Sequence, residues 1–537
     1  MKAFPSILFV LSALTMVNAA PPALSLEDAV ARTLASNPGV EIQRARITQA
    51  EGSLLSASGR FDWNTSLRLS DSLRRTPGLG AFPGGSIFDI IDFKSVNELL
   101  VAINRDPIVA PAGAPAYAVQ REEQRTVTLG ATRQLRNGIT ILPAATVFDY
   151  QVNTNPLPAA VRSEWGVEFV VPLARGLGRE SAAADERAAQ IGVDAARVLA
   201  GHGLAERVAR TAAAYWDCLA AERRLALLVD TEHRARDLVA LVGDLVRSGE
   251  VEPAVRLEAD AEAMRRRSET INGEMELFAA RQRLGVALGL KPEELPDAPT
   301  ASGEFPLAAA MAADARGVAA LVAQAMVARG DLRAVDYGRK VEEVYAARAR
   351  NEIRPRVDLN LRAGYAGGVL GDSLARYGPA LTSDLTGTNV SAALSVEWPT
   401  ANRGARGNLL RRNAQVREAE LSTAELATAI AADVAIAHAA LRTAAQQYGI
   451  ARDGVAALGE VLANQRRKLQ LGEIGLTALV QNEDRYFQAR TSLITASRNY
   501  AVAVLDLRRV TGTLVAGDGR GNRLSLTALT TPPPTTP

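Results

Sequence analysis

The sequence predicts an α+β membrane protein in which long coiled-coil helices follow short strands. Two Ala-, Arg- and Glu-rich tracts, 179–246 and 404–470, have a helical pattern, and each follows a segment of alternating polarity. Each tract ends before a turn that contains a glycine, Gly249 or Gly472. Because this order occurs twice, we expect two internal repeats. An uninterrupted helix of roughly 67 residues would be about 100 Å long, far more than the width of an ordinary domain.

The N-terminus has the features of a secretory signal peptide over residues 1–19. Lys2 precedes an apolar run at 7–17, and the small residues that end the segment at Ala19 form a cleavage site. The run is too short to span a bilayer, and no later stretch has about 20 uninterrupted apolar residues. We therefore expect an exported chain without an inner-membrane helix.

The charge and the cysteine content exclude two further kinds of protein. The 61 Lys and Arg residues nearly balance the 59 Asp and Glu residues, and the charges are interspersed, so no nucleic-acid partner is expected. The single cysteine, Cys218, cannot close an internal disulfide and is expected to be a small buried side chain. Stability must therefore come from packing or from oligomerisation.

The sequence offers no recognisable catalytic or metal site. Its three histidines, His202, His233 and His438, have no metal-ligating partner at helical spacing. A Gly-Leu-Gly segment at 176–178 lies between a strand and a helix, as a dinucleotide-binding loop does, but Ser181 takes the place of the third glycine. We expect no enzymatic activity and no cofactor.

Each repeat is expected to begin with an interrupted helix. The first, 26–57, begins after an N-cap at Ser25 and is broken by the Asn-Pro-Gly segment at 37–39. The second, 307–350, is broken by the Arg-Gly-Asp segment at 329–331. The breaks lie at comparable positions, which agrees with two repeats of one design.

Four segments alternate between apolar and polar residues, at 61–70, 165–172, 357–365 and 390–398. About nine or ten such residues suffice for a tilted strand to cross an outer membrane, although a soluble β-sandwich also shows alternation. Tryptophans near the ends of three strands indicate an aromatic girdle. In the first segment the apolar face would carry Phe61, Trp63, Leu67 and Leu69. The polar faces would line a pore, and the candidate lining residues are Asp62, Arg68, Asp358, Arg362 and Glu397.

Two further segments follow the first strand. Residues 72–124, which include Gly, Pro and a mixed apolar run, are interpreted as a cell-exterior loop. Residues 126–150 contain two alternating runs around Asn137 and Gly138, and the Asn-Gly pair favours a two-residue hairpin turn. The pattern does not decide whether this hairpin belongs to the barrel.

The long helices are expected at 180–289 and 404–511. Apolar residues recur along both tracts at intervals of three or four, which predicts seams for helix packing. Alanine dominates the other faces and permits close approach of neighbouring helices. The seam residues are Val208, Ala212, Tyr215 and Leu219 in the first tract and Leu426, Ile430, Val434, Ala437 and Leu441 in the second.

The two repeats are expected to cover 20–291 and 307–511. Between them, 292–306 is predicted to be a linker because of its proline content. The tail, 512–537, ends in a Pro- and Thr-rich run with few apolar residues, so it is predicted to be disordered.

This order of elements, with Leu24 to Val30 and the Asn-Pro pair at the mature start, resembles the TolC-like outer-membrane efflux proteins. The strand-to-helix passages at 171–178 and 397–399 match as well, and the resemblance covers nearly the whole mature chain. It implies a homotrimer whose strands share one β-barrel through the outer membrane, with about 12 strands, or about 18 with the extra hairpin. It also implies an α-helical coiled-coil barrel across the periplasm.

The resemblance implies a passive export duct of a tripartite efflux or type I secretion system. Its partners would be a periplasmic adaptor (membrane fusion) protein, an inner-membrane transporter and outer-membrane lipid. The alternative is a trimeric structural or adhesive coiled-coil protein anchored in the outer membrane. The implied adaptor-docking turns comprise Gly249, Glu250, Val251, Gly472, Glu473 and Ile474.

A ring of aspartates often follows the second turn in these proteins and borders the periplasmic aperture. This chain has Ala478 and Gln481 at those positions, so an acidic gate is not indicated. The aperture candidates that the sequence offers are Gln481, Asp484 and Asp260.

Overall fold

The computed structural model describes residues 23–79, 117–152, 160–249, 252–308, 315–371, 373–382, 387–470, 476–516, 523–524 and 526–533. The chain divides into two compact units. The helical unit comprises 1–52, 190–341 and 416–537, and the strand unit comprises 53–189 and 342–415. The predicted signal peptide, 1–19, lies outside the described residues.

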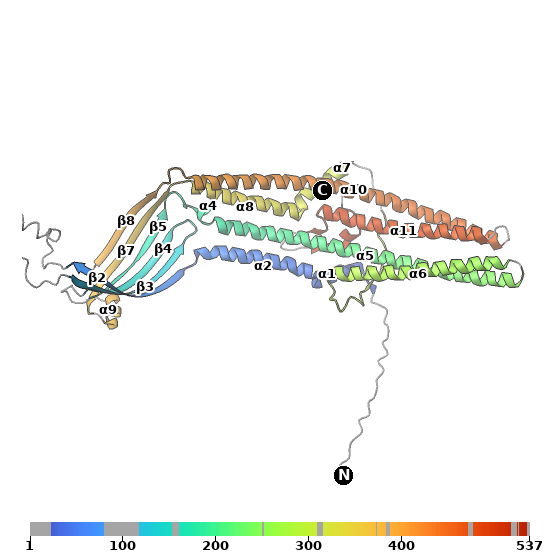
Figure 1. Ribbon diagram of the computed structural model, residues 1–537. Helices are drawn as coiled ribbons and strands as arrows, with labels where there is room; N and C mark the ends of the chain where they lie inside the picture. Colours follow the sequence, from blue (N-terminus) through green and yellow to red (C-terminus); the bar gives the residue numbers. More distant parts are fainter. Residues whose placement is uncertain are drawn as a thin grey trace, which may run out of the picture. The chain divides into compact units, whose positions relative to one another are not determined.

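The strand unit contains one antiparallel sheet of six strands in the order β2-β3-β4-β5-β7-β8, which lie side by side in Figure 1. The hairpin β3–β4 lies between β2 and β5, so the hairpin expected at 126–150 is part of the sheet. Its turn contains Gly138 at φ +99°, a left-handed conformation that favours glycine. The strands are β2 (Asn64–Leu79), β3 (Tyr117–Gln134), β4 (Thr140–Val152), β5 (Ala160–Pro172), β7 (Arg356–Leu370) and β8 (Gly387–Glu397).

The expected cell-exterior loop at 72–124 is wrong at both ends. Residues 72–79 continue β2 and 117–124 begin β3, with Ser72 opposite Gln124. These positions lack clean alternation because both faces carry polar or charged side chains. Cross-strand pairs such as Arg74 opposite Glu122 support the strands there instead. Residues 80–116 lie outside the described part of the chain.

Phe61 also differs from the prediction. It lies in the 3-10 helix η1 (Gly59–Phe61) before β2, and only 4% of it is exposed. The guanidinium of Arg136 lies 4.9 Å from the centre of its ring, and Arg133 donates a hydrogen bond to its carbonyl oxygen. Phe61 therefore packs at the start of the strand and does not extend the apolar face of β2.

The two interrupted helices have the predicted breaks. In the helical unit, Ser25 caps α1 (Leu26–Ser36) by accepting a hydrogen bond from the Asp28 amide, and α2 (Pro38–Ser58) follows Asn37. The Asn37 side chain donates to the Ala287 carbonyl at 2.7 Å, which ties the break to the helix at 253–288. The second pair is α7 (Ala315–Ala328) and α8 (Gly330–Glu352), separated by Arg329.

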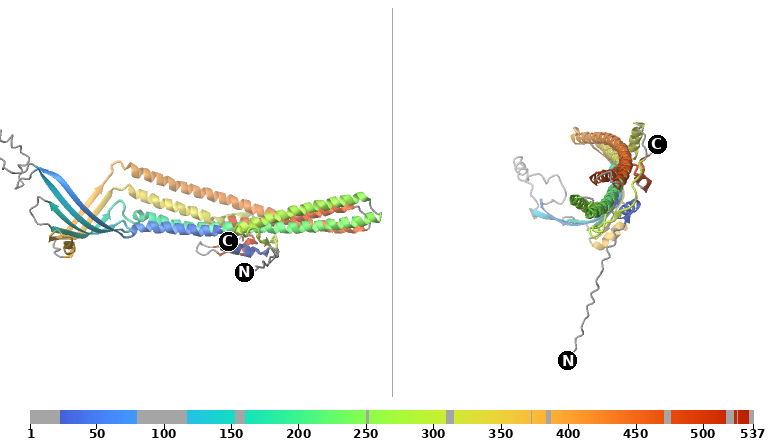
Figure 2. Two further views of the ribbon diagram at one scale, coloured as in Figure 1. Left: turned by 60° about the horizontal axis from the view of Figure 1, so that its bottom comes forward. Right: turned by 90° about the vertical axis from the view of Figure 1, so that its right-hand side faces the viewer.

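The long helices form two pairs, α5 (Ala184–Arg247) with α6 (Pro253–Leu288) and α10 (Arg403–Gln470) with α11 (Leu476–Val510), as Figure 2 shows. Helices α5 and α10 contain 64 and 68 residues. A one-turn helix, α4 (Arg179–Ala182), precedes α5 because Ala183 leaves the helical conformation at φ −105° and ψ 20°. The long tracts are thus helical, with the first starting slightly later than expected.

Two hydrophobic clusters form the core of the helical unit. The first joins α1, α5, α6 and α11 and contains Trp216 and Leu284; the second joins α7, α8, α10 and α11 around Leu321. The predicted seams lie in these clusters, with Val208, Ala212, Ile430, Val434 and Leu441 fully buried. Cys218 is fully buried as well, and burial raises the pKa of its thiol to about 11, so it is an inert core side chain.

The linker and the tail contain more structure than their composition indicates. Within 292–306, β6 (Thr300–Ala301) pairs in parallel with β1 (Ala23–Leu24), and Ala301 is buried in the first cluster. In the tail, Leu514 and Leu529 belong to the same cluster. The prediction of a disordered tail is therefore wrong for its described part, which contains β9 (Val515–Ala516), β10 (Arg523–Leu524) and η4 (Leu526–Leu529).

Candidate channel surfaces

The sheet has one apolar and one polar face. Residues directly opposite one another in antiparallel strands share a face, so the register assigns each side chain to one of the two. Large aliphatic residues of the apolar face are exposed, including Leu69 at 70% and Val390 at 77%. A wide sheet surface of this kind is unusual in water and is typical of contact with lipid. The exposed large apolar members of this face are Leu67, Leu69, Leu73, Leu129, Trp165, Phe169, Leu361, Tyr365, Val390, Leu394 and Val396.

The polar face carries four of the five candidate pore-lining residues. Arg68 is exposed opposite Thr128, and Glu397 is exposed opposite Arg356. Asp62 is the exception, because it caps η1 and precedes β2. Through the register this face continues from β2 to β8, and in β4 it also includes Leu142 and Phe148.

The other two candidates already have partners of opposite charge. A terminal nitrogen of Arg362 lies 2.9 Å from a carboxylate oxygen of Glu164. Nε of Arg356 lies 2.6 Å from Oδ2 of Asp358, which is only 6% exposed. These pairs reduce the net charge that the polar face presents.

Each outer strand of the sheet is paired on one side only. Within the described residues, β2 pairs with β3 and β8 pairs with β7, and neither pairs with another strand. The remaining edges present rows of backbone donors and acceptors. In lipid such groups must be satisfied by another strand.

Of the predicted docking turns, only Gly249 lies within the described residues. It has φ +80°, and its amide donates to the Val246 carbonyl at 3.2 Å. A side chain here would meet no atom within 4 Å, so the constraint on this position is the backbone conformation. Glu250, Val251, Gly472, Glu473 and Ile474 lie outside the described residues.

The three aperture candidates have different surroundings. Gln481 is exposed on α11, and Asp260 on α6 lies 4.0 Å from Nε of Arg256. Asp484 on α11 forms ion pairs with Arg265 and Arg266 of α6. Asp484 therefore holds two helices together in this structure, a role that its position alone did not indicate.

Arg266 is the centre of an arginine network between α6 and α11. Its side chain is only 4% exposed, and it lies 2.7 Å from Glu262 and 3.1 Å from Glu269 in addition to its contact with Asp484. Its guanidinium also lies 5.2 Å from the centre of the Phe487 ring. A buried guanidinium with several carboxylate partners is well compensated.

Glu262 in this network is held in its ionised form. Burial alone would raise the pKa of Glu262, but hydrogen bonds and charges from Arg265 and Arg266 outweigh it and leave the pKa lowered. The sequence contains a signal for the network that the prediction missed, because three consecutive arginines, 265–267, have glutamates three or four residues away on both sides. The partner Asp484 could not be found this way, since it comes from a distant helix.

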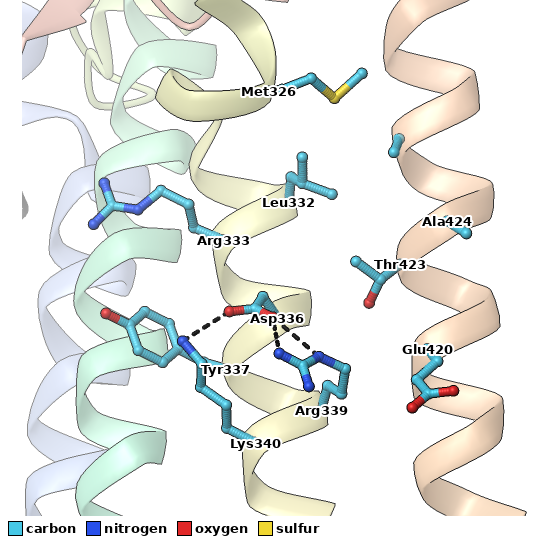
Figure 3. A pocket seen from close by; sticks show the side chains of 11 residues that line it. Met326, Leu332, Arg333, Asp336, Tyr337, Arg339, Lys340, Glu420, Thr423 and Ala424 are labelled. Atoms are coloured by element: carbon cyan, nitrogen blue, oxygen red, sulfur yellow. Dashed lines mark hydrogen bonds and ion pairs between the residues drawn. The ribbon is translucent and has the colours of Figure 1, made fainter. Parts of the chain in front are cut away.

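A cavity of about 650 Å³ lies between α7, α8 and α10 in the helical unit (Figure 3). Met326 and Leu332 line one part, whereas Asp336 accepts hydrogen bonds from Arg339 and Lys340 in another. The hydrogen bond from Lys340 is the main cause of the lowered pKa of Asp336, so this carboxylate is ionised and a weak base. The cavity thus resembles an ordinary gap between polar helix faces more than an active site.

No protein-family model and no curated protein sequence matches the chain. One open antiparallel sheet and two pairs of long helices nevertheless define a known class, the TolC-like channel fold. Solved structures with this fold include the CmeC outer membrane channel of Campylobacter jejuni, which matches with a TM-score of 0.61 and 12% identity, over 96% of this chain and 94% of its own.

Two further outer-membrane proteins align over similar lengths. VceC from Vibrio cholerae matches with a TM-score of 0.57 and 14% identity, over 91% of this chain and 96% of its own. The open state of the MtrE outer membrane channel of Neisseria gonorrhoeae matches with a TM-score of 0.57 and 16% identity, over 91% of this chain and 88% of its own. The predicted resemblance is therefore confirmed at the level of the fold.

Proposed function

We propose that this chain is the outer-membrane channel of an export system, either tripartite efflux or type I secretion. The observation that carries the proposal is the sheet, whose exposed apolar face and largely polar opposite face suit a strand wall between lipid and water. The similarity to outer-membrane channels over nearly the whole chain supports it. The protein would reside in the outer membrane, with its helices in the periplasm.

A homotrimer is the assembly that these surfaces support. The free edges of β2 and β8 would be closed by neighbouring copies, and three sheets of six strands would form one barrel of about 18 strands. The recurrence of an interrupted helix, strands and a long helix pair supports the origin of each chain by internal duplication.

Helix α10 supports the same assembly. Among the described residues it is the one helix with an 18-residue window apolar enough to span a membrane, with a mean hydropathy of 1.5, although only 28% of that window is buried. Ile430 and Leu441 point into the core, whereas Ile436 is 68% exposed. Contact with a second copy of the chain would cover this outer side, as expected for helices that share a tunnel wall.

Transport through the duct is passive in this proposal. Solute moves through a water-filled lumen along the polar face, where charges such as Arg362 and Glu164 largely cancel. The energy comes from an inner-membrane transporter, which a periplasmic adaptor protein connects to the turns at Gly249 and 472–474. The arginine network around Arg266 would stabilise the packing of α6 on α11 near this end of the helices.

The first test measures the mass and the conductance of the mature protein extracted from outer membranes in detergent. A mass of three chains and channel activity in a planar bilayer would support the proposal. A non-conducting trimer whose deletion leaves export unchanged would favour the structural or adhesive alternative. A monomer would contradict the shared barrel.

A further inference from the structure

Arginines cluster where the strands lead into the helices of the strand unit, and all of them except the half-buried Arg175 are exposed. They come from three segments, the β5–α4 connection, the end of α8 with the residues before β7, and the start of α10. None of them lies within ion-pair distance of a carboxylate in the part of the chain that the structure describes, although the charge of Arg179 contributes to the lowered pKa of Glu186. We name this group the arginine belt, and its members are Arg175, Arg179, Arg350, Arg354, Arg403 and Arg406.

Hydrogen bonds bring the three segments of the arginine belt together. The Arg175 amide donates to the Pro355 carbonyl at 3.3 Å, which places the first segment beside Arg354. The Asn402 side chain donates to the Ile353 carbonyl at 2.9 Å and so joins the start of α10 to the same place. The three segments that carry the belt are therefore adjacent in the strand unit.

The arginine belt borders the apolar face of the sheet. The Leu173 amide donates to the Val357 carbonyl at 2.7 Å, which extends the pairing of β5 with β7 and places Leu173, 45% exposed, at the rim. Trp63 and Trp398 lie at the same ends of their strands and are 48% and 73% exposed. Apolar, aromatic and basic surfaces thus follow one another in the order of hydrocarbon, interface and phosphate in a bilayer.

At the opposite end of the sheet, two arginines are paired with carboxylates. Arg121 forms an ion pair with Glu123, and Arg125 lies 3.8 Å from Asp149. Arg74 and Arg75 at that end are exposed and form no ion pair among the described residues, so the arginine belt differs from them by its position beside the apolar and aromatic rim. A surface of this kind attracts anions that lie at the level of the membrane interface.

We propose that the arginine belt binds the phosphate groups of anionic phospholipids in the periplasmic leaflet of the outer membrane. The inference rests on the proposed function, because it requires the sheet to span that membrane. Guanidinium groups bind phosphate oxygens through paired hydrogen bonds, and the rim of Leu173 and Trp398 contacts the adjoining acyl chains. The belt thereby fixes the depth at which the sheet sits in the bilayer.

The test measures which lipids remain bound to the purified protein. The mature protein is isolated in detergent that contains phosphatidylglycerol and phosphatidylethanolamine in equal amounts, and the retained lipids are determined by mass spectrometry. The variant R403Q/R406Q removes two charges from the belt. The matched control, R74Q/R75Q, removes two exposed arginines from the other end of the sheet.

We expect the wild type and R74Q/R75Q to be enriched in phosphatidylglycerol. The enrichment should fall roughly tenfold in R403Q/R406Q and in high salt, and R403K/R406K should retain much of it because the charge is preserved. Both positions lie in the first turn of α10, where loss of positive charge favours the helix, so circular dichroism should show intact folding. Equal enrichment in R403Q/R406Q and R74Q/R75Q would overturn the inference.

Two further outcomes identify what failed. If R403Q/R406Q changes the ion selectivity of the channel and not its lipid content, the arginines face the lumen and the inference is overturned. Retention of lipopolysaccharide with the same dependence on the belt would also overturn it. A conducting trimer without phosphatidylglycerol preference refutes this inference alone, whereas a protein that neither trimerises nor conducts refutes the proposed function as well.

Discussion

The two units of the chain differ in how much buried apolar core they contain. In the helical unit, Ile430 and Leu441 are fully buried, whereas in the sheet Leu69 and Val390 are 70% and 77% exposed. Burial of apolar side chains stabilises the helical unit in water. Exposure on the sheet is favourable only against another apolar medium, so the two units are built for different solvents.

The largest effect is expected from a cavity in the helical core. Leu441→Ala should lower the free energy of unfolding by roughly 2–5 kcal/mol, because the side chain is fully buried in the second hydrophobic cluster. Urea unfolding of the mature protein in detergent measures the loss. Leu421→Ala on the same helix is the control, since Leu421 is 54% exposed and should cost much less. Equal losses in both variants would contradict the packing described for α10.

A charge on the apolar face should act almost as strongly. Leu361→Arg, in the middle of β7, should destabilise the inserted protein by roughly 2–4 kcal/mol if the face meets lipid. Asn360→Arg, the neighbouring position on the polar face, serves as the control. The fraction of each variant that reaches the outer membrane as a heat-stable oligomer is the measurement. Comparable amounts of the two variants would argue against a lipid-facing surface.

Loss of the arginine network should have an intermediate effect. Arg266→Met keeps most of the side-chain volume but leaves Glu262, Glu269 and Asp484 without their central partner, and about 1–3 kcal/mol of stability should be lost. Hydrogen exchange of α6 and α11 would locate the change. Arg256→Met, which removes an exposed arginine of the same helix, should leave exchange unchanged. Protection that persists in Arg266→Met would exclude a role for the network in helix packing.

Acid pH should weaken the arginine network around Arg266. The pKa of Glu262 is lowered from 4.5, so its contribution to stability is complete above about pH 4.5 and disappears as the pH falls through the lowered value. We expect the wild type to lose stability in this pH range. Melting temperatures measured from neutral to acid pH would show the loss. The Arg266→Met variant should show a smaller dependence, and an identical dependence would assign the acid effect to other carboxylates.

The smallest effect concerns the polar face of the sheet. Arg362→Glu should shift channel selectivity toward cations, because the pair with Glu164 becomes two negative charges. Asp358→Asn removes a negative charge and should shift selectivity in the opposite direction, toward anions, and by less, since Asp358 is nearly buried and already paired with Arg356. Reversal potentials in a salt gradient measure both. Unchanged selectivity in Arg362→Glu would remove this face from the lumen.

The sequence predicted those elements whose signal is local. Alternation located the strand at 357–365, a capping serine located the start of α1, and spacing located the seam through Ile430. Where both strand faces are polar, as at 72–79, alternation disappears and register alone reveals the strand. Leu514 and Leu529 show the same limit. The composition of the tail that contains them suggests disorder, and only their packing into the core of the helical unit orders them.

The candidate site residues show the same difference between local signals and contacts with distant residues. Arg68 and Glu397 lie on the polar face because the period of a strand is a local property. The roles of Asp484 and Asp358 depend on which distant or neighbouring side chains reach them, and a linear pattern does not contain that information. The arginine belt escaped notice for a similar reason, because hydrogen bonds between three separate segments assemble it.

The unpaired edges of β2 and β8 have a consequence for biogenesis. If three copies close one barrel, no single chain can complete its own wall, and insertion and assembly become one event that follows the law of mass action. The yield of finished channels should then rise more steeply than in proportion to the supply of chains. A cell that makes too little of this protein would accumulate chains that chaperones and proteases remove, and would have fewer open routes to the exterior than its expression level suggests.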